Sequence, residues 1–330
     1  MHGIKRVHQS PEAAQVKKLR DQAKIQEYLA LTDEILSRKK NQDWSVDAFR
    51  LTSRLLQINP EFYTVWNYRR NILILGIFPH SSLQDVNNFI TDDLSMTTAA
   101  LRSHPKVYWI WNHRRWCLEN VPNGPGNKGE NDYSEWKKGN WDKEIYVVEK
   151  ILDADPRNFH AWNYRRYILA SMPVSKPLNS ELHYTARKIE ANLSNFSAWH
   201  QRSKILAILW DGKELFSIKS KEDELELAKN AMYTDPDDQS VWVYHRLMRK
   251  GNNKILLERE VSAIQELLDE QPDSKWCMES IVHYTQLLLR NHASSVDSPA
   301  LTSYCQSLLG RLQRLDPLRQ HRYKELGVSK

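Results

Sequence analysis

Apolar residues recur along the chain at the spacing of amphipathic helices. Ile145, Val148 and Leu152 stand at positions i, i+3 and i+7, and residues 261–268 repeat this spacing. Such a spacing places the side chains on one face of a helix. An Asp-Pro or Asn-Pro pair follows several of these segments and is expected to end the helix, because the residue before a proline is pushed out of the α region.

A second predicted helix follows each turn and carries a recurrent motif. A tryptophan stands six positions after the proline, and an arginine follows the tryptophan. Five copies are NPEFYTVWNYRR, HPKVYWIWNHRR, DPRNFHAWNYRR, ANLSNFSAWHQR and DPDDQSVWVYHR, the fourth with Leu193 in place of the proline. In two weaker copies, QPDSKWCM and DPLRQHRY, the same step reaches Met278 and Tyr323.

The anchor residues of these seven copies lie 36 to 51 positions apart. A period of roughly 40 residues, with two helices per unit, indicates a solenoid. We therefore predict an all-α fold, a right-handed α-α superhelix of about seven helix-pair repeats. Residues 1–40 are expected to form an N-terminal helical segment and residues 41–330 the repeats. Residues 121–140, with four of the ten glycines, are expected to be an inserted loop.

Composition narrows the class of protein further. The chain has 330 residues, only 10 glycines, 12 tryptophans and a net charge of +6. It lacks the GxGxxG, GxxxxGK[ST], GxSxG and HExxH motifs, which disfavours those enzyme classes. Its longest apolar run has seven residues, far short of the roughly 20 that span a bilayer. With no secretory signal and three scattered cysteines, we expect a soluble, cytoplasmic protein without a membrane segment.

The motif residues have two possible roles. The tryptophans are expected to fill the space between adjacent helix pairs. The first arginine of each motif should form a ladder along one surface of the stack, which pairs either with carboxylates of the neighbouring repeat or with a partner or anionic ligand. These anchor residues are Trp66, Arg69, Trp111, Arg114, Trp162, Arg165, Trp199, Arg202 and Trp242, with Arg246 in the fifth motif.

Two motifs also carry a cation in the turn that enters the tryptophan helix. Lys106 precedes Tyr108, and Arg157 precedes His160. Cations beside a helix N-terminus are placed to bind a phosphate-like anion, although solvated loop charges are an equally good interpretation. The 12 histidines show no metal-binding spacing. The residues alone predict a helical scaffold that binds something, without a catalytic group of its own.

The repeats resemble those of the prenyltransferase α-subunit family. DPRNFHAWNYRR is the most distinctive segment, whereas a tetratricopeptide array would show a 34-residue period and a different pattern. Within the family, MHGIKRV, EAAQVKKLRDQAKIQEYLALTDEIL and TDPDDQSVWVYHR resemble the α subunits of the type II, or Rab, geranylgeranyltransferases in their short, fungal-like form. The resemblance covers essentially the whole chain.

This resemblance implies an enzyme that is active only as a heterodimer. The α solenoid would wrap a β subunit that holds zinc and the lipid. Geranylgeranyl would pass from geranylgeranyl diphosphate to C-terminal cysteines of Rab GTPases, which an escort protein presents. Neither nucleic acid binding nor stable membrane insertion is expected. The alternatives are the α subunit of a farnesyl or type I geranylgeranyl enzyme, and a non-catalytic helical-repeat adaptor.

Three site predictions follow from matching this chain to the family residue by residue. The family's α-side lysine near the diphosphate matches Lys106, with Tyr108 beside it, and another register gives that role to Arg157. Either cation would stabilise the leaving group electrostatically. His2, in a mobile N-terminus, is a further candidate that would reach the zinc of the β subunit.

Overall fold

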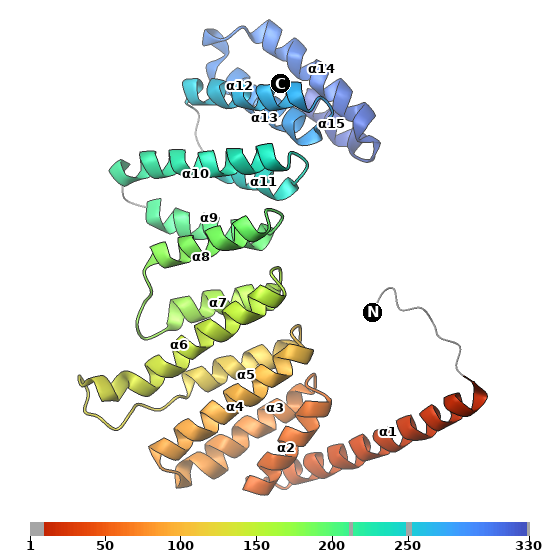
Figure 1. The fold of residues 1–330 in the computed structure, drawn as a ribbon, viewed down its shortest axis with the longest axis vertical. Coiled ribbons are helices and arrows are strands. Elements are labelled where there is room, and N and C mark those ends of the chain that lie inside the picture. The colour runs from red at the N-terminus through yellow and green to blue at the C-terminus, as the bar shows by residue number, and fades with distance from the viewer. Residues whose placement is uncertain (1–9, 211–213, 249–252, 329–330) are drawn as a thin grey trace. The chain divides into compact units, whose positions relative to one another are not determined.

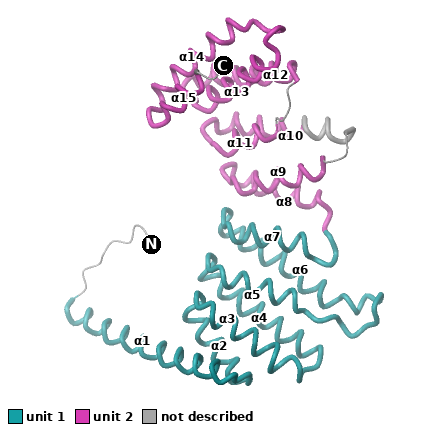
Figure 2. The backbone as a smooth tube through the Cα atoms, turned by 180° about the vertical axis from the view of Figure 1, so that it is seen from behind, with its two compact units in different colours: residues 1–175 teal, residues 176–330 magenta. Residues whose placement is uncertain are grey.

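The computed structural model describes residues 10–210, 214–248 and 253–328. Within these ranges the chain forms fifteen α-helices and no strand, so the predicted all-α class is confirmed. After α1, the helices form seven consecutive pairs, as the repeat count predicted (Figure 1). The chain divides into two compact units, residues 1–175 and 176–330, which Figure 2 shows in teal and magenta.

Unit 1 holds α1 and three pairs. In Figure 1, α1 extends away from the stacked pairs, and of its residues only Leu31 and Ile35 are buried. Helices α3, α5 and α7 pack on one another, and α4 packs on α6. The bounds are α1 Pro11–Lys40, α2 Val46–Ile58, α3 Tyr63–Asn71, α4 Leu83–Ser103, α5 Tyr108–Glu119, α6 Asn131–Ala154 and α7 Phe159–Ser171, with a π-helix η1 Ile72–Ile77 and a 3-10 turn η2 Phe78–His80 after α3.

Unit 2 holds the other four pairs, and α9, α11 and α13 pack in succession. Its elements are α8 Leu178–Ala191, α9 Phe196–Trp210, α10 Glu214–Thr234, α11 Gln239–Met248, α12 Lys254–Glu270, α13 Lys275–His292, α14 Ser298–Leu315 and α15 Gln320–Val328, with 3-10 turns η3 Ala293–Ser295 and η4 Pro317–Arg319. Met278 and Tyr323, the anchors of the weaker motifs, are fully buried and take the place of tryptophan in the last two pairs.

The prediction of a loop over residues 121–140 is wrong for residues 131–140. Only 121–130 are irregular, and α6 starts at Asn131. Asn140 and Trp141 are buried, and the Asn140 side-chain amide donates to Asn87 Oδ1 of α4 at 3.2 Å. These contacts hold residues 131–140 in α6 even though Gly139 disfavours a helix by about 1 kcal/mol relative to alanine.

The five tryptophans of the motif lie in the core, each at most 5% exposed. Each indole N–H donates to the backbone carbonyl six residues earlier, at 2.7–3.0 Å. The acceptor is the proline carbonyl in four motifs and the Leu193 carbonyl in the other. The spacing of the motif therefore serves to satisfy a buried donor, and the proline ring is not needed for it.

Candidate functional site

The ladder arginines lie inside the protein and bind carboxylates of the next helix pair. The Arg69 Nη2 and Nε atoms donate to the two oxygens of Asp93 at 2.5 and 3.0 Å. Arg114 binds Glu144 in the same two-pronged way, at 2.7 and 2.6 Å. The other guanidinium nitrogen, Nη1, donates to a backbone carbonyl twenty residues earlier, that of Phe49 for Arg69. Such forked ion pairs join consecutive pairs within unit 1.

The same arrangement occurs in unit 2, where Arg202 binds both oxygens of Glu224 at 2.6 and 2.8 Å and its Nη1 donates to the Leu182 carbonyl. In the third repeat, Arg165 Nη1 donates to Glu149 Oε1 at 3.2 Å within its own pair. In the fifth repeat the ladder position belongs to His245, not Arg246.

His245 links two further helices in place of a guanidinium. Its Nε2 lies 2.9 Å from Glu260 Oε2 on α12, and its Nδ1 lies 2.9 Å from the Tyr284 hydroxyl on α13. Arg69, Arg114, Arg165 and His245 are at most 3% exposed, so these side chains stabilise the stack and are inaccessible to a ligand. The sequence left two roles open for these side chains. Those in the described part of the chain pair with neighbouring carboxylates and do not face a ligand.

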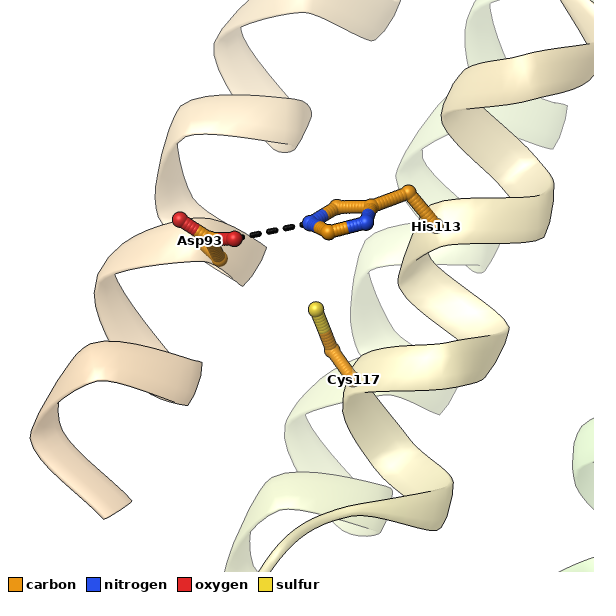
Figure 3. Close-up of side chains that lie close together, drawn as sticks. All are labelled: Asp93, His113 and Cys117. Atoms are coloured by element: carbon orange, nitrogen blue, oxygen red, sulfur yellow. Dashed lines mark hydrogen bonds and ion pairs between the residues drawn. The ribbon is translucent and has the colours of Figure 1, made fainter. Parts of the chain in front are cut away.

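Asp93, His113 and Cys117 form the one cluster with metal-ligand atoms among the described residues (Figure 3). Their ligand atoms lie within 4.8 Å of one another. His113 Nε2 lies 2.7 Å from Asp93 Oδ2, and Arg70 Nε donates to His113 Nδ1 at 3.3 Å. Nδ1 therefore carries no proton, and Nε2 is the donor to Asp93.

The chemistry of this cluster does not suit a cation. Burial raises the pKa of the Cys117 thiol well above its usual value, so the sulfur stays protonated, whereas a metal requires the thiolate. Burial also works against the charged form of Asp93, but Arg69 and His113 outweigh it and hold the pKa of Asp93 below its usual value. Both Asp93 oxygens already accept hydrogen bonds. The guanidinium groups of Arg69 and Arg70 would also repel a metal ion. The cluster is a structural part of the ladder.

The candidate site lies at the N-terminal ends of α5 and α7. Lys106 is exposed two residues before α5, and Tyr108, its first residue, is 50% exposed. The Tyr108 ring packs edge-on against His160 of α7, with the ring centres 5.3 Å apart. Partial burial and the charge of Lys106 lower the pKa of His160, so its imidazole is neutral at pH 7.

The structure thus joins Lys106, Tyr108 and His160 in one surface cluster. Arg157 is exposed in the turn before α7. Asn158 connects the two turns, since its Oδ1 accepts the Ala161 N–H at 3.1 Å and its Nδ2 donates to the Pro105 carbonyl at 3.3 Å. His2 lies outside the described residues.

A row of exposed aromatic side chains starts the tryptophan helices. Tyr63, Tyr108 and Phe159 are the first residues of α3, α5 and α7 in unit 1, and they are 52%, 50% and 66% exposed. Tyr63 also packs on Trp109, with ring centres 5.1 Å apart. Phe196 holds the same position on α9 in unit 2. Ring contacts of Tyr108 with Trp109 and His160, and of Phe159 with His160, connect this row.

Comparison with known proteins identifies the family. The family model described as "Protein prenyltransferase alpha subunit repeat" matches residues 46–74, 90–121, 141–172, 178–209 and 221–249. The "Geranylgeranyl transferase type-2 subunit alpha" of Schizosaccharomyces pombe is 36% identical over 99% of this chain and 97% of its own length. The chain belongs to the protein prenyltransferase α-subunit family.

Two more members of the family with the same description are similar over nearly their whole length. The Candida albicans protein is 35% identical over 98% of this chain and 96% of its own length. The Saccharomyces cerevisiae protein is 33% identical, with coverage of 99% and 98%. The segments that match the prenyltransferase repeat follow the helix pairs from α2/α3 to α10/α11. The pairs after residue 249 complete the same stacking without the Trp-Arg signature.

A solved prenyltransferase structure supports the fold. The "Candida albicans protein geranylgeranyltransferase-I complexed with GGPP" superposes with a TM-score of 0.68 over 92% of this chain and 90% of that chain, at 21% identity. At this identity the likeness concerns the fold. None of the described helices is long and apolar enough to cross a membrane.

Proposed function

We propose that this chain is the α subunit of a type-2 geranylgeranyltransferase and acts as a heterodimer with a β subunit. The observation that carries the proposal is the full-length similarity, at 33–36% identity, to fungal proteins described as "Geranylgeranyl transferase type-2 subunit alpha". A farnesyl or type I α subunit would share the fold, and an adaptor would share the repeats. The similarity over both termini favours the type-2 enzyme.

In the proposed reaction, a cysteine sulfur of a Rab GTPase bonds to C1 of the geranylgeranyl group. The C1–O bond breaks, diphosphate leaves, and the thiol proton passes to solvent. Zinc held by the β subunit would lower the pKa of the cysteine thiol. The buried cluster at Asp93 in this chain does not suit a metal. An escort protein would present the Rab substrate.

The contribution of this chain to the chemistry would be fixed positive charge. Lys106 is exposed at the start of α5, and a cation here would face the negative charge that develops on the leaving diphosphate. The Tyr108 hydroxyl and the neutral His160 imidazole are hydrogen-bond donors beside it. Arg157, in the equivalent turn before α7, is the second candidate for the same role.

The β subunit would cover the aromatic row at the starts of the tryptophan helices. Tyr63, Tyr108 and Phe159 expose half or more of their surface, which is unfavourable in water unless a partner covers it. Because Lys106 lies beside this row, docking of the β subunit would bring the lysine to the edge of the partner's lipid pocket. His2, near the N-terminus, would reach the partner's zinc by a separate route.

Co-expression tests the proposal directly. We expect this chain to co-purify with a β subunit at one-to-one stoichiometry with bound zinc, and the complex to transfer labelled geranylgeranyl from its diphosphate to a Rab GTPase when an escort protein is present. The chain without a β subunit should be inactive. Failure to capture a zinc-containing partner, together with no transfer, would leave the adaptor as the better description.

A further inference from the structure

Unit 2 contains a small cavity among α11, α13, α14 and α15, with a volume of about 60 Å³. A cavity volume of about 10–15 Å³ is enough for one water molecule, so this cavity has room for a small polyatomic ion. Its apolar lining comes from Val282, Leu309, Leu312 and Leu326. Its polar lining comes from Arg246, Glu279, His283, Gln286 and Arg322.

Positive charge exceeds negative charge around this cavity. Glu279 is 6% exposed and faces three guanidinium groups. Its carboxylate oxygens lie 3.7 Å from Arg246 Nη2, 3.7 Å from Arg319 Nη1 and 3.6 Å from Arg322 Nη2. Three positive charges against one leave an excess of two. Asp316 does not remove this excess: its carboxylate lies 3.8 Å from Arg319 Nε and 4.0 Å from Lys275 Nζ, so that with Lys275 included four cations face two carboxylates.

The N–H groups of these arginines also have few close hydrogen-bond acceptors. All three guanidinium distances to Glu279 exceed hydrogen-bonding range, and Glu279 Oε1 accepts a hydrogen bond from the Tyr323 hydroxyl at 2.9 Å. Arg246 Nη2 donates to Ser280 Oγ at 3.3 Å, while its Nε is shielded from water and has no hydrogen-bond partner among the described residues. A buried N–H without an acceptor is costly and points to a missing acceptor.

We propose that this cavity binds a small oxyanion of the phosphate class, held by Arg246 and Arg322. Guanidinium groups bind phosphate through paired N–H···O bonds, and a tetrahedral oxyanion supplies several acceptors at once. His283 adds a donor, because burial and the charges of Arg246 and Arg290 lower its pKa and keep the imidazole neutral at pH 7. The apolar lining restricts the ligand to a single phosphoryl group, either free phosphate or a phosphate monoester of a larger molecule.

Titration calorimetry on the full-length chain at constant ionic strength tests the proposal. We expect one equivalent of inorganic phosphate to bind, and Arg322→Gln to weaken binding at least tenfold. Arg322 has a 56% exposed side chain, so this substitution should leave the fold intact, which a melting curve in phosphate-free buffer checks. The matched control is Arg259→Gln, an exposed arginine on α12 outside the cavity lining, and should bind within twofold of wild type.

A second arm separates the two sources of phosphate and keeps the test independent of folding. Phosphoserine binding as tightly as inorganic phosphate would assign a phosphorylated group, and binding of inorganic phosphate alone would assign the free ion. In either case the imidazole resonance of His283 should shift on saturation, and Lys106→Ala should bind normally because Lys106 belongs to the other site. No saturable binding, or equal weakening by Arg259→Gln, would overturn the proposal.

Discussion

Each residue of the repeated motif has a separate physical task. The tryptophan fills the core and uses its indole N–H to satisfy a turn carbonyl, as between Trp162 and Pro156 at 2.8 Å. The first basic residue ties one helix pair to the next in the first, second, fourth and fifth motifs. The exposed positions before the tryptophan differ between repeats, and only there does the motif leave side chains free for chemistry, as at Lys106.

Lys106→Ala should reduce prenyl transfer by the heterodimer without affecting its assembly. Loss of one fixed charge that stabilises a developing anion typically lowers kcat by about 10²–10³. Arg157→Ala should have a smaller effect if Lys106 is the diphosphate contact. Single-turnover rates measure both, with Lys143→Ala, an exposed lysine on α6, as the control. A rate for Lys106→Ala within twofold of wild type would refute this role.

Asp93→Asn should destabilise the chain in a pH-dependent way. The folded state holds the pKa of Asp93 below its unfolded value of about 3.9, so the carboxylate stabilises the fold fully above that pH. This contribution is lost as the pH falls below about 4 toward the folded pKa. Urea unfolding at pH 7 and at pH 3 should therefore show a larger difference from wild type at pH 7. An equal difference at both values would contradict the ion-pair account.

At the scale of helices, the repeat period and the motif predicted the pairs because tryptophan burial and turn geometry are local in sequence. The ladder partners were not predictable in this way. Asp93 follows Arg69 by 24 residues and Glu144 follows Arg114 by 30, because the connections between pairs differ in length. No fixed spacing therefore marks the carboxylates. The fifth ladder position was assigned to Arg246 from the sequence, and His245, which stands directly before it, was missed.

The start of α6 shows a second limit of local reasoning. Glycine and polar residues over 121–140 resemble a loop, yet Trp141 and Asn140 pack against the neighbouring pair and hold the segment in a helix. Tertiary packing here overrides propensity. The surface cluster was only partly predictable: the motif placed Lys106 and Tyr108 together, while the approach of His160 depends on how α5 and α7 stack.

Gly76→Ala should destabilise unit 1 because η1 lies directly on the chain between α1 and α2. A Cβ at Gly76 would stand 2.1 Å from the Trp44 carbonyl oxygen, so backbone would have to move. Gly139→Ala is the matched control, because a Cβ there meets open space and alanine favours the helix by up to about 1 kcal/mol. Thermal unfolding should show a lower Tm for the first variant and an unchanged or higher Tm for the second. The reverse order would disprove this packing.

At the scale of the whole molecule, buried charged residues and exposed aromatic residues have different roles. The ladder residues are inaccessible and stabilise the stack, whereas the aromatic row is left for a partner. Phe159→Ala should leave the Tm of the isolated chain unchanged, because the ring is 66% exposed, but should weaken assembly with the β subunit at least tenfold. Sedimentation or calorimetry measures the affinity. Unchanged affinity would mean that the β subunit docks elsewhere.

The most direct test of the account is the substrate choice of the heterodimer. Labelled geranylgeranyl diphosphate would be supplied with either a Rab GTPase plus escort protein or a CaaX peptide alone. A type-2 enzyme is expected to modify the Rab protein only with the escort and to leave the peptide unmodified. Efficient transfer to the CaaX peptide without an escort would contradict the account and assign the chain to a farnesyl or type I enzyme.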